Sequence, residues 1–320
     1  MVKIAIAGAS GNVGLEVVNA LASTGKHEIL ALSRKDGPPN EIPALSGVTW
    51  IKTDYSNLQR LTELLEGVDT VLSFIVVHLD QGNMAQKNLI DAAVKARVRR
   101  FAPSEWVGAR MDHMPWVEHG KQDIRDHLKK LNSEKKVLEY SLFQPGMFLN
   151  YLTHPHKSAK YLPTIATPFD FENRRAIILE ESDDVPMTLT TVQDLANIVS
   201  KAVEHDDEWP LVGGISGNTV TMRELIAIGE KVRGAPFNVE RLKFDDLKAE
   251  MVKSSWRPKI EHHAFTPEEM EALELQVVSG IVLAIGSGAM EASDEWNKLL
   301  PSYKFTKAEE FLSAAWKGKD

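Results

Sequence analysis

The amino-acid sequence predicts an α/β fold, with a doubly wound parallel sheet followed by a smaller α/β region. Over the first 150 residues, short apolar runs typical of buried strands alternate with stretches whose apolar residues recur at helical spacing. Such alternation is typical of a parallel sheet with helices on both faces. It ends after residues 144–146, Gln-Pro-Gly, and the rest of the chain mixes short strands with helices. We therefore expect one domain at residues 1–150 and a smaller region at 151–320, with some segments interleaved with the first.

The first predicted strand runs into a glycine-rich turn. The apolar run at 2–7 ends at Gly8, and Gly11 and Gly14 complete a GxxGxxG spacing before a stretch of helical periodicity. Glycines allow a tight strand-to-helix turn, and the amides and dipole at a helix N-terminus attract an anion. The turn is expected to bind a dinucleotide pyrophosphate, and the alternative is a turn that only connects two elements. The expected contact residues are Gly8, Ala9, Ser10, Gly11, Asn12, Val13 and Gly14.

The end of the second strand, predicted at 29–32, indicates which dinucleotide binds. A carboxylate about 20 residues after the glycine turn would bond a ribose hydroxyl, whereas an arginine accommodates a 2′-phosphate. Here the strand is followed by Ser33, Arg34 and Lys35, and the first carboxylate is Asp36. A hydroxyl and two cations suit a phosphate. We predict NADP, in its reduced form NADPH, and the alternative is that the two cations are solvated surface residues.

The later elements follow in the order of a Rossmann domain. Strands are predicted at 49–53, 70–75, 100–102 and 140–143, and helices at 58–65, 84–96 and 120–131. In such a domain ligands lie beyond the carboxyl ends of the strands. The residues expected there around the cofactor are Asp54, Tyr55, Ser73, Phe74, Ile75, Ser104, Pro145, Gly146 and Phe148. The residues expected to line a substrate pocket, closed by the smaller substrate-binding region, are His78, Trp106, His113 and Tyr151. That region is expected to contain a strand at 175–179 and helices at 192–203 and 222–232.

The composition excludes several classes of function. Of 320 residues, 43% are hydrophobic and 26% are charged, and the formal net charge of −8 disfavours binding to nucleic acid or to an anionic membrane. The most apolar window, at 277–289, holds three glycines and two serines and is too short for a membrane helix. Without cysteine there are no disulfides and no thiolate chemistry. The histidines at 154 and 156 and at 262 and 263 lack a third ligand, so no metal is expected. The expected location is the cytoplasm.

Several motifs spread along the chain belong together. They are GxxGxxG at 8–14, Arg34, Arg-Phe-Ala-Pro-Ser-Glu-Trp at 100–106, Lys121 with Arg125, and Gln-Pro-Gly-Met-Phe at 144–148. The set resembles the NmrA-like, isoflavone-reductase-like branch of the atypical short-chain dehydrogenases. The resemblance spans nearly the whole chain, and the segment at 100–106 is its most specific element. Trp106 departs from the pattern, because phenylalanine is common at that position.

The resemblance implies an NADPH-dependent reductase acting on phenylpropanoids or other aromatic, conjugated metabolites. It also implies a lysine near nicotinamide and substrate, on the helix after the fifth strand, and Lys121 matches that lysine. The Tyr-x-x-x-Lys of ordinary short-chain dehydrogenases occurs only as Tyr303 with Lys307, far downstream, and is interpreted as a chance match. Lys121 is thus the expected catalytic residue, as proton donor or oxyanion stabiliser. An apolar ring and a cation nearby would lower its pKa toward a useful value.

Two other functions are compatible with the same motifs. The family also contains NADP-binding regulators that have lost chemistry, in which the second region would bind a regulatory protein partner. The same crevice could also catalyse an isomerisation or cyclisation without net reduction. The matched Lys121 favours an enzyme. Substrate identity, hydride face and oligomeric state depend on the shape of the pocket.

Overall fold

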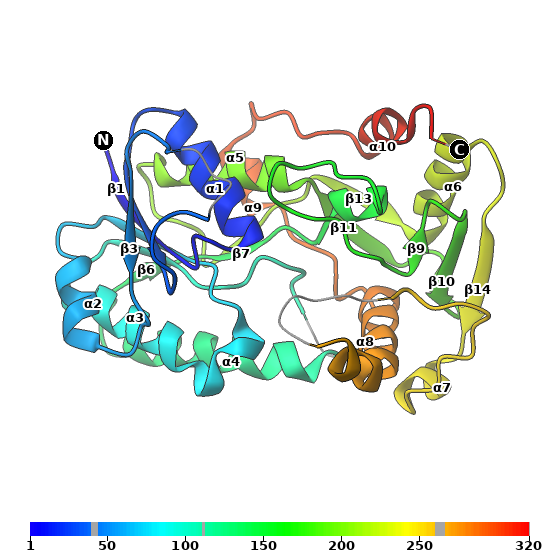
Figure 1. The fold of residues 1–320 in the computed structure, drawn as a ribbon, viewed down its shortest axis with the longest axis horizontal. Coiled ribbons are helices and arrows are strands. Elements are labelled where there is room, and N and C mark those ends of the chain that lie inside the picture. The colour runs from blue at the N-terminus through cyan, green and yellow to red at the C-terminus, as the bar shows by residue number, and fades with distance from the viewer. Residues whose placement is uncertain (40–43, 111–112, 260–265, 320) are drawn as a thin grey trace.

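A sheet of six parallel strands forms the centre of the N-terminal half (Figure 1). The computed structural model describes residues 1–39, 44–110, 113–259 and 266–319. The strands are β1 (Lys3–Ala7), β2 (Glu28–Ser33), β3 (Val48–Lys52), β4 (Thr70–Ser73), β5 (Arg100–Ala102) and β6 (Glu139–Tyr140). Their order, β3-β2-β1-β4-β5-β6, reverses direction beside β1, as in Rossmann domains. The predicted fold class is confirmed.

Helices cover both faces of this sheet. They are α1 (Asn12–Ser23), α2 (Leu58–Leu64), α3 (Met84–Lys95), α4 (Pro115–Leu131) and α5 (Val192–Val203). Successive side chains of a strand point to opposite faces, so Ile4 and Ile6 pack toward α1 and α5. Ala5 and Ala7 pack on the other face, toward α2, α3 and α4. Because both faces are buried, the strands appear in the sequence as apolar runs.

Most predicted boundaries agree with the structure within two residues. Helix α4 begins earlier than predicted, at Pro115 instead of residue 120, because proline is well suited to the first turn of a helix. The strand predicted at 140–143 is two strands: β6 continues the sheet, whereas β7 (Leu142–Gln144) pairs with β12 (Val212–Gly214). Most of the apolar window at 277–289 lies in the last part of a longer helix, α8 (Pro267–Gly286).

The second half of the chain builds two further small sheets. One sheet contains β8 (Met147–Phe148), β11 (Pro186–Thr190) and β13 (Asn218–Thr221), and the other contains β9 (Phe169–Asp170), β10 (Arg175–Leu179) and β14 (Asn238–Leu242). The helices are α6 (Met222–Arg233), α7 (Phe244–Lys248), α8, α9 (Glu295–Leu299) and α10 (Ala308–Trp316), with short 3-10 turns η1 (Val77–Leu79), η2 (Gln81–Asn83) and η3 (Leu149–Thr153). These elements pack around apolar clusters of their own.

Segments from the second half also complete the apolar cluster between the central sheet, α1 and α5, which is called the first core below. Val192, Trp209 and Trp296 belong to the same apolar cluster as Ile4 and Ile6. The Trp296 ring is fully buried and stacks on Phe143 with ring centroids 5.3 Å apart. Side chains from both halves of the chain therefore share this core. The division into two regions at residue 150 stays a prediction.

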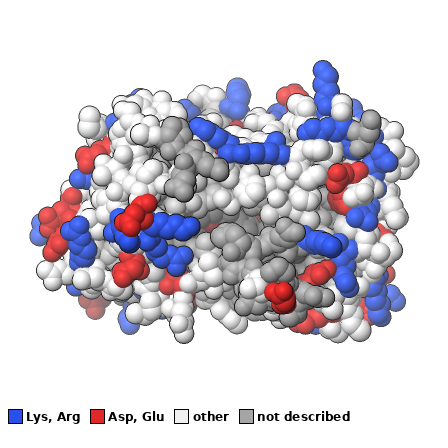
Figure 2. Space-filling view, viewed as in Figure 1, with Lys and Arg blue, Asp and Glu red and all other residues white. Residues whose placement is uncertain are grey.

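The surface carries both signs of charge. Figure 2 shows acidic and basic side chains interspersed over one face of the molecule. Among the described helices none is long and apolar enough to cross a membrane. Within the same residues, no group of three or more histidine or acidic side chains could hold a metal ion. The histidine pair at 262 and 263 lies outside the described residues.

Replacing Trp296 with alanine is expected to lower the free energy of unfolding by about 3–5 kcal/mol, because it removes a large buried ring from the core that both halves share. Urea unfolding followed by circular dichroism measures the loss. Leu299→Ala is the control, because Leu299 lies on the same helix and is 38% exposed, and its expected loss is below about 1 kcal/mol. Equal losses in the two variants would contradict the shared core.

Candidate functional site

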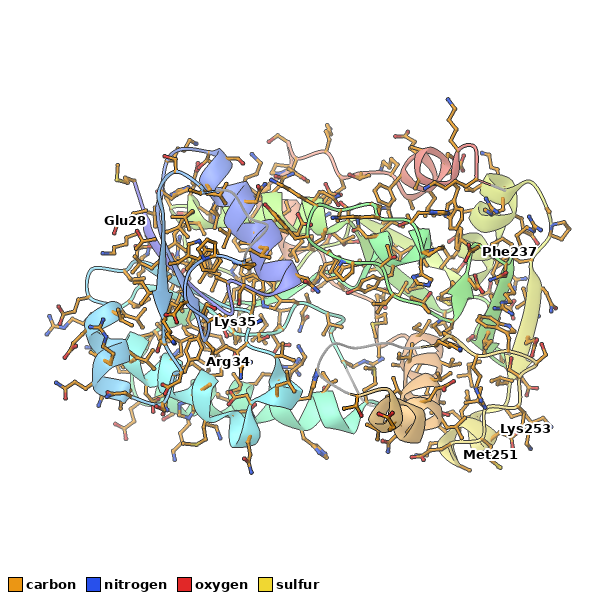
Figure 3. All side chains as sticks on the ribbon, in the orientation of Figure 1. Glu28, Arg34, Lys35, Phe237, Met251 and Lys253 are labelled. Carbon is orange, nitrogen blue, oxygen red and sulfur yellow. The ribbon has the colours of Figure 1, made fainter. Side chains whose placement is uncertain are left out.

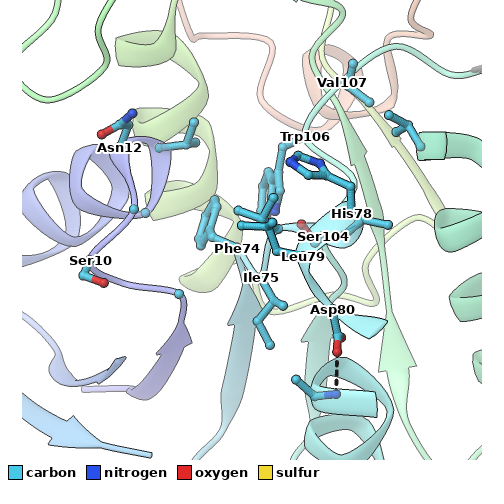
Figure 4. Close-up of a pocket in the computed structure, with 18 of the residues that line it drawn as sticks. Ser10, Asn12, Phe74, Ile75, His78, Leu79, Asp80, Ser104, Trp106 and Val107 are labelled. Atoms are coloured by element: carbon cyan, nitrogen blue, oxygen red, sulfur yellow. Dashed lines mark hydrogen bonds between the residues drawn. The ribbon is translucent and has the colours of Figure 1, made fainter. Parts of the chain in front are cut away.

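A cavity of about 2050 Å³ opens at the carboxyl ends of the central strands (Figure 4). It is lined by the residues that follow β1, β2, β3, β4 and β5, which are far apart in the sequence. Parallel pairing brings these strand ends to one edge of the sheet. The predicted site residues that line it are Gly8, Ser10, Gly11, Asn12, Val13, Gly14, Ser33, Arg34, Lys35, Asp54, Tyr55, Phe74, Ile75, His78, Ser104, Trp106, Lys121 and Tyr151.

The glycine turn is tightly packed against its neighbours. Gly8 has a φ of +70°, and a Cβ atom there would lie 2.7 Å from the carbonyl oxygen of Phe74. A Cβ atom on Gly14 would lie 2.7 Å from the carbonyl oxygen of Gly8. Helix α1 begins directly after Gly11, and no side chain caps that end. The amides of its first turn are therefore available to an anion in the cavity.

A tyrosine from the neighbouring loop braces the turn. The Tyr55 hydroxyl accepts a hydrogen bond from the Gly8 amide (3.0 Å) and donates one to the carbonyl oxygen of Leu32 (3.0 Å). Burial raises the pKa of Tyr55 to about 12, so the hydroxyl stays protonated and keeps both bonds. Tyr55 thus ties the ends of β1 and β2 together. Tyr55 lines the cavity, as the sequence predicted, but the sequence did not indicate its hydrogen bonds to Gly8 and Leu32.

The end of β2 presents cations and hydroxyls to the cavity. Figure 3 labels Arg34 and Lys35 at this end of the strand. The Ser33 hydroxyl donates to the Ser10 hydroxyl (3.2 Å) and accepts from the Lys35 amide (3.0 Å), which joins this loop to the glycine turn. Asp36, the first carboxylate after the strand, pairs with Lys52 at 2.7 Å. The carboxylate is thus engaged away from the cavity, and a ligand at this end meets mainly positive charge.

Lys121 lies in the cavity wall with its ammonium group buried. The side chain comes from α4, and its Nζ atom donates to the carbonyl oxygen of Ser104 (3.0 Å) and to that of Glu105. Arg125, one turn further along the helix, makes two bonds to the Glu105 carboxylate (2.9 and 2.7 Å). Two residues of one helix face therefore hold the same short loop.

The environment of Lys121 lowers its pKa to about 8. Burial is the largest cause, because it penalises the charged form, and the Arg125 cation acts in the same direction. The negative charges of Glu105 and Glu118 oppose both effects. An ammonium with this pKa is still mostly protonated at neutral pH and gives up its proton more readily than a surface lysine.

Aromatic rings form the floor beside Lys121. Phe74 and Trp106 are stacked with ring centroids 4.3 Å apart and an interplanar angle of 14°. The Trp106 indole N–H donates to the carbonyl oxygen of Ser73 (2.7 Å), which fixes the ring although Trp106 has a φ of +44°. Figure 4 shows both rings together with His78, which lies in η1, and Ser104, which follows β5. Tryptophan at this position thus anchors the floor as well as forming it.

The cavity has a polar part and an apolar part. The ends of β1, β2 and β3 supply the glycine turn, the hydroxyls and the cations described above. The segment between β5 and α4, the first turn of α4 and the second half of the chain supply mainly apolar groups. Those groups are Val107, Met114, Val117, Tyr151, Leu162, Pro163 and Ile165. Lys121 is close to the boundary, because its ammonium binds the loop that follows β5.

Some predicted cofactor residues do not line the cavity. Ala9 is fully buried, and its amide donates to the carbonyl oxygen of Leu32 (3.2 Å). Ser73 is also fully buried, and it acts through the carbonyl group that holds Trp106. Both residues lie behind the cavity wall, and their neighbours in the chain line the cavity.

Four further residues point elsewhere. Pro145 and Gly146 are outside the lining, because Gly146 has a φ of +72° and its α-carbon is turned against Thr188. Phe148 packs into the first core with its ring edge-on to Tyr151. His113 lies with its ring 6.0 Å from that of Phe244 and is also outside the lining.

The lining also contains residues that the sequence did not indicate. They are Ser56, Leu79, Asp80, Gln81, Met84, Ala85, Asn88, Val107, Met114, Val117, Leu162, Pro163, Thr164, Ile165, Lys259 and Glu274. Asp80 caps α3, because its carboxylate accepts from the amides of Ala85 and Gln86 (2.9 Å each). Its signal in the sequence was an acidic residue shortly before a helix. Gln86 is a buried glutamine that accepts from the Ser104 amide (2.7 Å). Tyr303 is outside the lining and donates to Asp194 (2.7 Å).

Residues 2–312 match the model of the NmrA-like family, so this chain belongs to that family. Oxidoreductase BOA1 of Botryotinia fuckeliana is 26% identical, over 95% of this chain and 97% of that relative. Among solved structures, AtPrR2 with NADP+ and (+)pinoresinol matches with a TM-score of 0.69 and 20% identity over 98% of both chains. The NADPH-dependent quinone oxidoreductase QOR2 of Escherichia coli, complexed with NADPH, matches with a TM-score of 0.69 and 19% identity, over 98% of this chain and all of the other. The family resemblance and the Rossmann fold are confirmed.

Arg34→Ala is expected to weaken NADPH binding at least about tenfold, because it removes a cation from the part of the cavity suited to a 2′-phosphate. NADH carries no such phosphate, and its dissociation constant should change less than about twofold. Isothermal titration calorimetry measures both. Arg60→Ala, at an exposed arginine of α2, is the matched control and should leave both constants unchanged. Equal weakening of the two nucleotides by Arg34→Ala would remove Arg34 from phosphate recognition.

Proposed function

We propose that this NmrA-like protein is an NADPH-dependent reductase that transfers hydride to an aromatic or conjugated small molecule, with Lys121 as proton donor or oxyanion stabiliser. The observation that carries the proposal is the buried ammonium of Lys121 between the polar and apolar parts of one cavity. The relatives support it, since BOA1 is called an oxidoreductase and the two structural neighbours are complexes with NADP+ or NADPH.

The residues of the polar part fit a phosphorylated dinucleotide. The uncapped end of α1 offers amides to a pyrophosphate, and Arg34 and Lys35 offer charge to a 2′-phosphate. The volume of about 2050 Å³ exceeds the roughly 300–1,000 Å³ of ordinary ligand sites, which leaves space for a second molecule. When bound, NADPH supplies the hydride. The protein then has to hold, orient and protonate the acceptor.

Lys121 is suited to the proton-transfer part of this reaction. A protonated amine has three N–H donors, and the carbonyl oxygens of Ser104 and Glu105 take two of them. The third is available to an oxygen of the substrate in the cavity. A fixed ammonium in a buried site stabilises developing negative charge more strongly than one in water. The lowered pKa also assists donation of the proton.

The apolar part indicates the substrate class. Phe74 and Trp106 present a stacked aromatic floor, and Val107, Met114 and Ile165 add aliphatic surface. Flat, conjugated molecules pack well on such rings. Residues of the 151–320 region contribute Tyr151 and the wall at 162–165, which supports a substrate-binding role for that region. This substrate class is similar to the pinoresinol named with AtPrR2.

Wild-type protein is expected to oxidise NADPH in the presence of a quinone such as menadione, measured as loss of absorbance at the nicotinamide band. Lys121→Met should lower kcat at least about a hundredfold and leave the NADPH dissociation constant within about twofold. Lys129→Met, at an exposed lysine of the same helix, is the control and should retain activity. Unchanged turnover in Lys121→Met would remove Lys121 from the mechanism.

The same assay separates the other two functions. Product formation from an aromatic substrate without NADPH consumption would favour the isomerase or cyclase. Tight NADPH binding with no turnover of any quinone or conjugated carbonyl compound would favour the regulator that only senses the nucleotide.

The pH dependence of kcat tests the role of Lys121 as an acid. Burial lowers its pKa to about 8, so the required protonated form is present below that pH and is lost above it. We expect kcat to be constant near neutral pH and to fall about tenfold per unit well above pH 8. Lys121→Arg should retain less activity but show no such fall, because a guanidinium stays protonated. The same inflection in Lys121→Arg would assign the titration to another group.

A further inference from the structure

Helix α1 carries a buried carboxylate that the reductase mechanism does not use. Glu16 is only 6% exposed, although it lies little more than one turn after the glycine turn. One oxygen of its carboxylate, Oε1, accepts hydrogen bonds from the amides of Tyr161 (2.5 Å) and Leu162 (3.0 Å). Removing a carboxylate from water is unfavourable unless it is hydrogen-bonded. These two charge-assisted bonds offset that loss and attach a distant segment of chain to α1.

Glu16 belongs to a polar stripe along the helix. Asn12, Glu16 and Asn19 are four and three residues apart, so they follow one face of α1. Asn12 lines the cavity beside the glycine turn. At the other end of the stripe, Asn19 accepts a hydrogen bond from the Lys160 ammonium (2.7 Å). The stripe therefore begins at the cofactor part of the cavity and continues to the segment at 160–162.

The attached segment continues directly into the cavity wall. Leu162, Pro163, Thr164 and Ile165 all line the cavity, and they have no regular secondary structure. No strand pairing fixes their backbone, so their position depends on individual contacts. Leu162 packs into the first core, and the Thr164 hydroxyl lies 3.3 Å from His154 Nδ1. The two bonds to Glu16 fix the backbone at the start of this wall.

We propose that Glu16 is a positioning residue for the substrate, because it seats the wall at 162–165 on the helix that binds the cofactor. The proposal rests on the proposed function in that it takes the apolar part of the cavity as the substrate site. Loss of the carboxylate frees the start of the wall and loosens the substrate side. The first turn of α1, which faces the cofactor, keeps its own contacts. Substrate affinity therefore depends on Glu16, and NADPH affinity does not.

Two variants separate charge from shape. Glu16→Leu has a similar size and is compatible with a helix, but it removes both acceptor bonds. Glu16→Gln keeps an oxygen in place and loses the charge, so it should restore part of the effect. Ser23→Ala is the control, because Ser23 is an exposed polar residue near the end of the same helix.

Amide hydrogen exchange, resolved to single residues by NMR, tests the seating without any turnover. In Glu16→Leu the amides of Tyr161 and Leu162 should exchange at least about tenfold faster, with a smaller increase in Glu16→Gln and none in Ser23→Ala. The dissociation constant of NADPH should stay within about twofold in all three variants. Unchanged exchange at both amides in Glu16→Leu and Glu16→Gln would overturn the proposal.

Ligand binding tests the consequence for the substrate side. The dissociation constant of the amphiphilic aromatic dye 8-anilinonaphthalene-1-sulfonate and the KM for menadione should each rise at least about fivefold in Glu16→Leu, with a smaller change in kcat. Faster exchange with unchanged dye binding and unchanged KM would also overturn the proposal, because the segment at 162–165 would then not contribute to the substrate site. Absence of menadione turnover in wild type would count against the proposed reductase alone, since exchange and dye binding still decide the role of Glu16.

Discussion

The position of the loop Ser104–Trp106 at the end of β5 is the constraint on which the candidate site depends. Four contacts fix it: Lys121 binds two of its carbonyl oxygens, Arg125 binds the Glu105 carboxylate, Gln86 accepts from the Ser104 amide, and Trp106 donates to Ser73. They come from α3, α4 and β4, so the loop is held from several sides. Because the loop contacts Lys121 and includes Trp106 of the aromatic floor, a shift in it would move the Lys121 ammonium and that floor together.

Local patterns explain which parts of the molecule could be predicted from the sequence. Ile4 and Ile6 lie on one face of β1, and Ala5 and Ala7 on the other, so the strand appears as an unbroken apolar run. The glycine turn has its own signature because Gly8 requires a positive φ and close packing. Lys121 could be found only through the family motif. The wall at 162–165 has no periodicity and no motif, since it is placed by contacts with a helix more than a hundred residues earlier.

A motif identifies residues that lie near a site, but it does not say which of them face it. The segment at 144–148 belongs to the family pattern, yet Gly146 is turned against Thr188 and Phe148 is packed in the core. Side-chain direction alternates along a strand, and a single positive φ reverses the course of the backbone. Ala9 and Ser73 show the same effect at the ends of β1 and β4, where neighbouring residues line the cavity and these two do not. Consecutive residues near a strand end can therefore face different directions, and only some of them line the cavity.

Burial has the largest effect on the pKa of Lys121, and it lowers that pKa. The Glu105 carboxylate has the second largest effect and raises the pKa. Arg125 binds both carboxylate oxygens of Glu105 and lowers the pKa of Lys121 through its own positive charge, so it offsets part of the effect of Glu105. The lowering by burial therefore dominates. Glu16 has a similar arrangement, since its charge is satisfied by two backbone amides. Both buried carboxylates thus hold neighbouring parts of the chain around the cavity through hydrogen bonds.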